Sequence, residues 1–273
     1  MLMNAVTRHH VSVSGRPDGP PIVFVHGFGC DQHMWRNVTP AFADEYRIVM
    51  MDLMGAGGSD VSSYDPQRYS SLEGYAADIT EVVRELDLRD AVLVGHSVSA
   101  MLVALTQQAE PERVAALVMV APSPRYIDEP GYTGGFGEED VDELLESLGS
   151  NYLGWSAAMA PAIMGNPERP ALGEELTESF CRMDPAIARL FASVTFRSDS
   201  RALLPQIEVP TLVLQCTDDV LAPVAVGEYV ADKMPRGTMV LLETTGHCPH
   251  LSDPVPTTEA IVTFVHDLGL VPA

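Results

Sequence analysis

The segment Gly95-His96-Ser97-Val98-Ser99 decides the fold expected for this chain. It lies between the apolar run 91–94 and a stretch of helical character at 100–108. A strand that stops at a small residue, presents a serine and turns at once into a helix has the geometry of a nucleophile elbow. The strand and helix backbones approach closely there, so Gly95 and Ser99 have the small size required. An ordinary strand-to-helix turn that happens to contain a serine is the alternative interpretation.

Two later segments supply chemical partners for Ser97. A serine hydroxyl is a weak nucleophile near neutral pH unless an imidazole takes its proton and a carboxylate orients that imidazole. One β-rich run, 211–215, leads into Asp218 and Asp219, and a second, 239–243, leads into His247. The order serine, acid, histidine, each after a strand, matches the triads found with such elbows. We therefore predict that Ser97 is the nucleophile and His247 the base, although His247 in a surface loop is the alternative.

Two neighbouring acids compete for the orienting role. Asp219 stands four residues before Pro223, a spacing typical of such triads, and we assign the role to it. Asp218 is then expected to be a loop or capping group.

The expected oxyanion hole combines two backbone N–H groups. The buried strand at 23–25 leads into His26-Gly27-Phe28-Gly29, a loop flanked by glycines. The N–H groups of Phe28 and of Val98 are predicted to point at a developing oxyanion, usually the largest electrostatic contribution in acyl transfer. A His-Gly loop alone is also compatible with a simple tight turn. His26 is expected to brace the loop by hydrogen bonding.

Length and composition favour one large, acidic α/β domain with an insertion. The chain has 273 residues and a net charge of −22, which disfavours nucleic acid and anionic membranes as partners. The N-terminal residues 1–8 lack the apolar core of a signal peptide, and no apolar stretch is long enough to span a bilayer. The four cysteines form no CxxC pair, so we expect reduced thiols in a soluble cytoplasmic protein.

Apolar runs alternate with helical patterns along the first half of the chain. This alternation predicts an α/β fold with a mostly parallel sheet and helices on both faces. The predicted strands are 22–25, 47–51, 91–94 and 117–121, and the predicted helices are 78–86 and 100–108. Residues 9–14 alternate in polarity and are predicted to form an antiparallel edge strand.

The strand pattern stops at 125 and resumes at 211. Residues 125–198 show helical stretches only, so we predict a helical cap over a core formed by 1–124 and 199–273. Such a lid excludes water and shapes a pocket. The cap carries Tyr126, Phe136, Trp155, Met159, Phe180, Phe191 and Phe196, which as a set predict a fairly small apolar pocket. The alternative for any single one is a packing role between cap and body. The predicted pocket residues are Phe28, His96, Tyr126, Phe136, Trp155, Met159, Phe191 and Phe196.

Other motifs carry little information. The run 55–60 is glycine-rich but lacks the final glycine of a dinucleotide fingerprint, so we interpret it as a loop with Asp52 and Asp60 as local hydrogen-bonding groups. His247 and His250 lack the further ligands that a catalytic metal needs. We expect no cofactor and no metal.

Four longer strings together carry a resemblance to the α/β-hydrolase superfamily that spans nearly the whole chain. They are Gly27-Phe28-Gly29-Cys30-Asp31-Gln32, Gly95-His96-Ser97-Val98-Ser99-Ala100, Ala121-Pro122-Ser123-Pro124-Arg125-Tyr126 and Gly246-His247-Cys248-Pro249-His250-Leu251. They look like the RsbQ-like bacterial stress-signalling hydrolases and are similar to the plant strigolactone and karrikin receptors. The resemblance implies a mostly parallel sheet of the eight-stranded type and a V-shaped cap of four helices. It also implies a Ser97, Asp219, His247 triad and a hydrophobic pocket for a small lipophilic ester or lactone.

Two classes of function follow. The first is a serine hydrolase of small hydrophobic esters or lactones, for which the RsbQ-like resemblance implies a role in stress signalling upstream of a PAS-containing protein phosphatase. The second is a ligand sensor whose slow hydrolysis is secondary to partner binding. His26 before Gly27 is common among hydrolases at large, so a metabolic carboxylesterase or enol-lactonase also stays open. A dehalogenase is disfavoured because that chemistry needs a carboxylate where this chain has Ser97.

Overall fold

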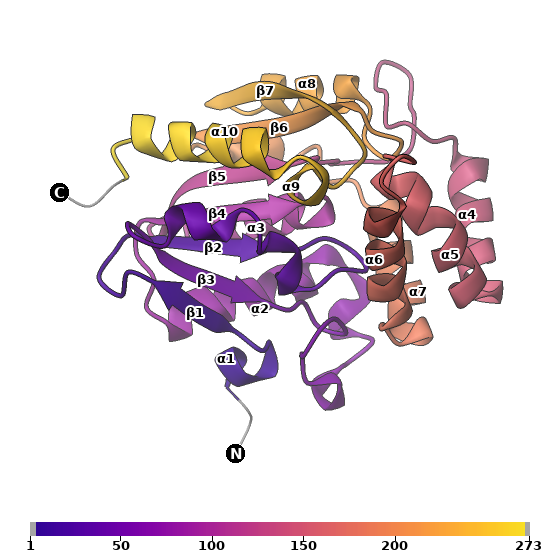
Figure 1. Cartoon of the computed structure of the whole chain (residues 1–273), viewed down its shortest axis with the longest axis horizontal. Coiled ribbons are helices and arrows are strands. Elements are labelled where there is room, and N and C mark those ends of the chain that lie inside the picture. Colours follow the sequence, from indigo (N-terminus) through magenta and orange to yellow (C-terminus); the bar gives the residue numbers. More distant parts are fainter. Residues whose placement is uncertain (1–3, 271–273) are drawn as a thin grey trace.

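One seven-stranded sheet forms the centre of the protein, whose computed structural model describes residues 4–270 (Figure 1). The strand order is β1-β3-β2-β4-β5-β6-β7. The pair β1 and β3 is antiparallel and every other pairing is parallel. The strands are β1 Ser12–Gly15, β2 Pro21–Val25, β3 Arg47–Met51, β4 Ala91–His96, β5 Val114–Val120, β6 Thr211–Asp218 and β7 Gly237–Thr245. The predicted fold class is confirmed, with seven strands in the described residues instead of eight.

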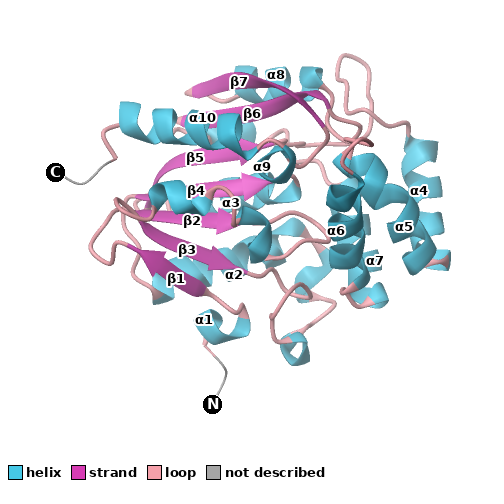
Figure 2. Ribbon diagram, in the orientation of Figure 1, coloured by secondary structure: helices cyan, strands magenta, loops and turns pink. Residues whose placement is uncertain are grey.

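Helices cover both faces of this sheet (Figure 2). The α-helices are α1 Ala5–Arg8, α2 Leu72–Glu85, α3 Val98–Ala109, α4 Glu138–Ser150, α5 Tyr152–Met164, α6 Pro170–Cys181, α7 Pro185–Arg197, α8 Val224–Lys233, α9 Pro249–Ser252 and α10 Pro254–Asp267. In the view of Figure 2, α10 lies in front of the sheet, and α2, α3 and α8 lie behind it. Within the described residues, no helix is both long and apolar enough to cross a bilayer.

The central strands are buried and mainly apolar because both of their faces are covered. Every residue of β4 is buried, and six of the seven residues of β5 are buried. Continuous Val/Leu-rich runs of this kind are typical of parallel strands between two helical layers. The predicted strands 22–25, 47–51 and 91–94 fall within β2, β3 and β4 and are confirmed. The carboxyl ends of these strands meet at one edge, where the site residues gather.

At the start of the chain, the prediction of an antiparallel edge strand is confirmed, but the strand begins later than predicted. The predicted edge strand 9–14 is shortened to Ser12–Gly15, and the preceding residues form α1 and a turn. His9 is buried within 3.4 Å of the Asp78 carboxylate, and that tertiary contact overrides the alternating pattern. The first three and last three residues of the predicted core ranges, 1–124 and 199–273, lie outside the described residues.

The inserted segment is less uniformly helical than predicted. Its four helices α4–α7 lie beyond the carboxyl ends of the strands (Figure 1). Helix α5 packs on α6, and α4 packs on α7. Residues 126–137, however, form an irregular loop with isolated bridges between Ile127 and Phe136 and between Glu129 and Tyr132. That a distinct cap begins at 125 stays a prediction.

The turn between β4 and α3 predicts a specific stability effect. A Cβ atom at Gly95 would lie 2.3 Å from the carbonyl oxygen of Ser99, a backbone atom that cannot move aside cheaply. We expect Gly95→Ala to lower the free energy of unfolding by about 2–4 kcal/mol, measured by urea denaturation. Gly131→Ala is the matched control, because Gly131 has φ +84° but nothing within 4 Å of its added Cβ. It should cost only about 1–2 kcal/mol of backbone strain, and equal losses in the two variants would contradict the close-approach explanation.

Candidate active site

Ser97 occupies a strained turn at the carboxyl end of β4. Its backbone angles, φ 58° and ψ −126°, are rarely adopted by a residue with a side chain. The turn is fixed on both sides, since the Ser97 N–H donates to the Val120 carbonyl at 2.8 Å and the Ala100 N–H donates to the Ser97 carbonyl at 2.9 Å. The strain is therefore held by neighbouring secondary structure, as in a nucleophile elbow.

Three buried side chains form a continuous chain of hydrogen bonds at this edge. His247 Nε2 lies 2.8 Å from Ser97 Oγ, and His247 Nδ1 lies 2.7 Å from Asp219 Oδ2. A carboxylate only accepts hydrogen bonds, so Nδ1 carries the proton and Nε2 is free to accept one from the serine hydroxyl. The structure thus brings together the three residues predicted for nucleophile, base and orienting acid.

The carboxylate is held by backbone groups. The other oxygen of Asp219, Oδ1, accepts from the N–H groups of Leu221 at 2.8 Å and Ala222 at 3.1 Å. Asp218 is exposed at the end of β6, where its carbonyl accepts from the Gly246 N–H at 2.7 Å. The geometry therefore places Asp219, and not Asp218, against the imidazole.

His247 is positioned by the inserted helices as well as by β7. Its N–H donates to the Ile163 carbonyl of α5 at 2.9 Å. The preceding Gly246 has φ +97°, and a Cβ there would lie 1.9 Å from the Met164 carbonyl oxygen, so only glycine fits. Asn166 adds a hydrogen bond from Nδ2 to the Thr245 carbonyl at 2.8 Å. The loop that carries the imidazole is thus tied to α5 and the turn that follows it.

The loop after β2 passes directly beside the elbow. A Cβ at Gly27 would lie 3.1 Å from the Ser97 Cβ. His26 donates from Nδ1 to the Gly27 carbonyl at 2.8 Å and accepts at Nε2 from the Leu53 N–H at 3.0 Å. Ser99 Oγ donates to the His26 carbonyl and links the loop to α3. The predicted bracing role of His26 is confirmed.

A small apolar cavity adjoins Ser97. Its volume is about 30 Å³, enough for one or two water molecules. It is lined by Phe28, Cys30, His96, Ser97, Tyr126, Trp155, Ile163, Leu176, Phe180, Thr195, Phe196, Leu221, His247 and Cys248. Five of the eight predicted pocket residues are therefore present: Phe28, His96, Tyr126, Trp155 and Phe196.

The other three predicted pocket residues do not line the cavity. Phe136 lies in the loop before α4 and packs behind Phe196, with ring centroids 6.2 Å apart. Phe191 stacks on Tyr75 of α2 at 4.2 Å, so its side chain fixes α7 to the body. Met159 is half-buried, because the inward face of α5 runs through Trp155, Ala160 and Ile163. Phe191 therefore packs the cap against the body, which was the alternative to a role in the pocket.

The sequence analysis missed several lining residues. They are Cys30, Ile163, Leu176, Thr195, Leu221 and Cys248. Phe180, one of the cap residues expected to form the pocket, does line the cavity and lies 5.7 Å from Phe28 between ring centroids. Cys30 and Cys248 had a usable signal in the sequence, because each lies within three residues of a predicted site residue.

Burial decides the charge state of the histidines around Ser97. Burial holds the pKa of His96 well below its usual range and lowers the pKa of His250 to about 3, and the positive potential of neighbouring groups acts in the same direction. Burial likewise raises the pKa of the Tyr126 phenol, whereas its hydrogen bond with Ser97 acts in the opposite direction. His96, His250 and Tyr126 are therefore neutral at pH 7. The hydrogen-bonded residues Ser97, His247 and Asp219 thus have no additional charge from these three neighbours.

Comparison with known proteins agrees with this geometry. Residues 22–260 match the model of a family described as "Alpha/beta hydrolase family". The chain belongs to this family. It is 37% identical to the karrikin insensitive 2 receptor CA of Petunia hybrida, over 94% of this chain and 96% of that protein. It is 35% identical to the strigolactone esterase D14 of Arabidopsis thaliana, over 86% and 89% of the two chains.

A solved structure is similar across the same length. A hydrolase from Oleispira antarctica superposes with a TM-score of 0.94 at 36% identity, covering 97% of this chain and 98% of that one. The predicted membership of the α/β hydrolases and likeness to plant karrikin and strigolactone receptors are confirmed. The finer likeness to RsbQ-like proteins stays a prediction.

The link between the elbow and the neighbouring loop generates a second prediction. Ser99 is fully buried and donates to a carbonyl of another element, His26. Ser99→Ala removes that donor, and we expect a loss of about 1–2 kcal/mol in the free energy of unfolding. Ser156→Ala is the control, because this equally buried hydroxyl donates to the Tyr152 carbonyl within its own helix at 2.8 Å. Its loss should be well under 1 kcal/mol, and a larger loss than for Ser99→Ala would refute the linking role.

Proposed function

We propose that the protein is a serine hydrolase that cleaves small hydrophobic esters or lactones through Ser97, His247 and Asp219. The observation that supports this most strongly is the buried hydrogen-bond chain, with 2.8 Å between Ser97 Oγ and His247 Nε2 and 2.7 Å between His247 Nδ1 and Asp219 Oδ2. Relatives named as esterases support the ester-hydrolase class.

In the proposed reaction, Ser97 Oγ attacks the carbonyl carbon while its proton passes to His247 Nε2. Asp219 orients the ring and stabilises the imidazolium that forms. The N–H groups of Phe28 and Val98 are proposed to hold the oxyanion; that of Val98, the first residue of α3, has no carbonyl partner within its own helix. His247 returns the proton to the leaving alcohol, and water then releases the acyl group by the same path in reverse.

The cavity favours an apolar, compact acyl or lactone group. Aromatic rings of Phe28, Trp155 and Phe180 pack edge to face or stacked, with centroids between 5.7 and 6.3 Å apart. Because the cavity holds only about 30 Å³, a ligand of more than a few atoms needs these rings to separate. Movement of α5 and α6 relative to the body is therefore part of the proposed cycle.

A ligand-sensor function is the second candidate. The relatives named as karrikin receptors, at 34–37% identity, favour it. In this version the pocket binds and slowly cleaves a small apolar molecule, and a changed cap surface contacts another protein. The PAS-containing protein phosphatase and the cytoplasmic location stay predictions from the sequence.

Removing the nucleophile tests the hydrolase proposal. We expect Ser97→Ala to lower the turnover of p-nitrophenyl acetate by roughly 10³-fold or more, because no other group can form the acyl-enzyme. The substitution removes one oxygen, so thermal unfolding of the variant should resemble that of the native chain. Unchanged turnover in a folded variant would refute the proposal.

The two adjacent acids provide a matched pair. Asp219→Asn should lower kcat by roughly 10³–10⁴-fold, because an amide that donates to Nδ1 stabilises the wrong tautomer of His247. Asp218→Asn should stay within about twofold of the native enzyme, because Asp218 is exposed and lies outside the chain of hydrogen bonds. The reverse result would move the orienting role to Asp218.

The rate and the ligand response separate the two candidate functions. A panel of lactones and esters is measured for turnover and for shifts in Tm. Rapid multiple turnover with small Tm shifts favours the enzyme. Slow turnover with large shifts, retained in Ser97→Ala, favours the sensor.

A further inference from the structure

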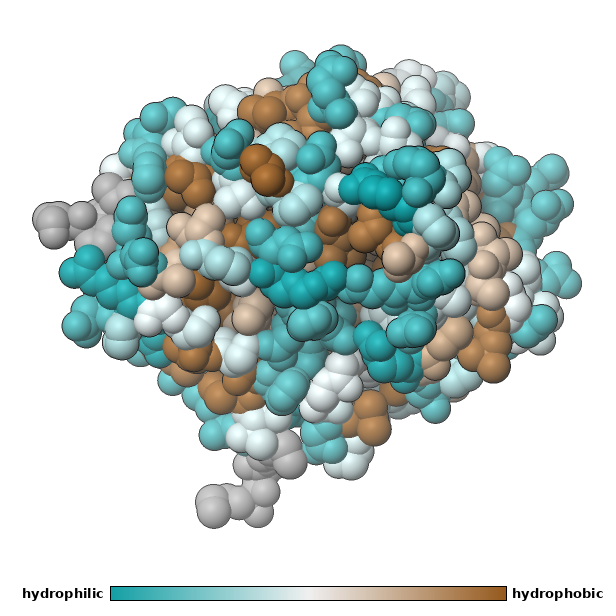
Figure 3. Space-filling model, viewed as in Figure 1, coloured by the Kyte–Doolittle hydropathy of each residue, from teal (hydrophilic) through white to brown (hydrophobic). Residues whose placement is uncertain are grey.

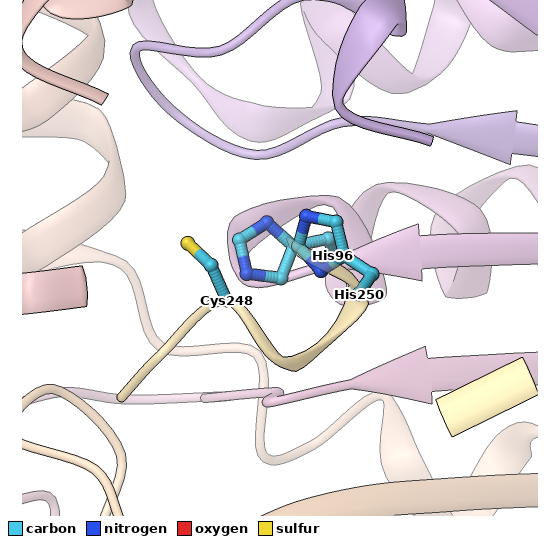
Figure 4. Close-up of side chains that lie close together, drawn as sticks. All are labelled: His96, Cys248 and His250. Atoms are coloured by element: carbon cyan, nitrogen blue, oxygen red, sulfur yellow. The ribbon is translucent and has the colours of Figure 1, made fainter. Parts of the chain in front are cut away.

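A second cluster of chemically capable side chains lies behind the nucleophile. His96, Cys248 and His250 are all buried, and their nearest ligand atoms lie within 4.8 Å of one another. Figure 4 shows the two imidazoles and the thiol gathered between the end of β4 and the start of α9. Only His96 and Cys248 also line the cavity beside Ser97.

His96 has one ring nitrogen that is free to bind a metal ion. Its Nε2 lies 2.8 Å from the His247 carbonyl, and a carbonyl only accepts, so Nε2 carries the ring proton. Nδ1 is then an unprotonated lone pair, and within residues 4–270 it has no hydrogen-bond partner. A histidine whose far N–H is held by a carbonyl while the other nitrogen is free has the orientation of a typical metal ligand.

His250 is the more unusual member. Both of its ring nitrogens are buried, and neither has a hydrogen-bond partner among the described residues. The ring is clamped between Trp35 and His96, with centroid distances of 4.6 and 4.5 Å. Buried polar atoms without partners are rare and call for an explanation.

The three donors match one class of ligand. Two neutral imidazoles and a thiol are the donors preferred by thiophilic metal ions with filled d shells, of which Zn²⁺ and Cu⁺ are examples. One thiolate would neutralise Cu⁺ entirely and half of the charge of Zn²⁺, which suits a buried apolar site. Ligand atoms around a tetrahedral ion are roughly 3.3–3.8 Å apart at the usual bond lengths. Side-chain rotations that bring the three ligand atoms about 1 Å closer together would give these distances.

We propose that His96 Nδ1, a ring nitrogen of His250 and Cys248 Sγ form a binding site for a thiophilic metal ion. A fourth position faces the cavity, since two of the three ligands line it. This proposal differs from the sequence prediction of no metal site. That prediction paired His247 with His250, because the sequence does not reveal that His96 at the end of β4 lies beside His250. It is independent of the proposed hydrolysis, because Ser97, His247 and Asp219 are not ligands.

The test measures metal stoichiometry on the full chain. Protein stripped with a chelator is dialysed against Zn²⁺, or against Cu⁺ under anaerobic reducing conditions, and bound metal is determined by elemental analysis. All samples carry Cys181→Ala, because Cys181 is the exposed thiol. We expect one ion per chain for at least one of the two metals, and the arm that binds identifies the ion.

Variants then locate the ion. Cys248→Ala should weaken binding at least 100-fold, whereas Cys30→Ala should leave it unchanged, since Cys30 lines the same cavity but is outside the ligand set. His250→Gln should also weaken binding, and thermal unfolding checks that it folds. With Co²⁺ as a probe, the sulfur-to-metal charge-transfer absorption should vanish in Cys248→Ala and persist in Cys30→Ala.

Two results would overturn the proposal. One is the absence of stoichiometric binding of either ion to the folded chain. The other is equal binding by the Cys248→Ala and Cys30→Ala variants, which would place the metal elsewhere on this acidic protein. Neither result bears on the triad, whose test is esterase turnover in Ser97→Ala.

Discussion

The close approach of β4 and α3 around Ser97 is the constraint on which the site depends. Gly95 lets the strand meet the first turn of the helix, and the Ser97 backbone takes up the resulting strain. That turn places the hydroxyl at the carboxyl edge of a parallel sheet, where the ends of β6 and β7 also arrive. The packing of the buried central strands thus fixes the position of one polar atom.

The inserted helices do more than cover this edge. They bind the two loops that complete the site: Ile163 holds the backbone of His247, and Ser179 Oγ donates to the Gly29 carbonyl at 2.8 Å. If α5 or α6 moved to open the cavity, these hydrogen bonds would pull on the loops that carry the His247 imidazole and the proposed oxyanion donors. In either proposed function, ligand entry would therefore be coupled to the geometry of the site.

The buried residues His96, Cys248 and His250 are polar side chains in an apolar environment near Ser97. Burial keeps His96 and His250 neutral, so they add no competing charge to the Ser97–His247–Asp219 chain. Both imidazoles lie close to Cys248, with one ligand atom of each residue within 4.8 Å of the others. Burial therefore has two effects here: it keeps these imidazoles uncharged beside the Ser97–His247–Asp219 chain, and it leaves His96 Nδ1 and both His250 ring nitrogens without hydrogen-bond partners among the described residues at the proposed metal site.

The sequence by itself determined the sheet class, the elbow and the order of Ser97, Asp219 and His247, because these depend on local periodicity and on which residue follows each strand. It determined the pocket in part: five of the eight predicted residues line the cavity. Phe136, Met159 and Phe191 have the right residue types, but the direction of each side chain depends on how α4, α5 and α7 pack. Only the tertiary structure decided that His96 meets Cys248 and His250, since segments more than 150 residues apart become neighbours only when β4 and β7 join one sheet.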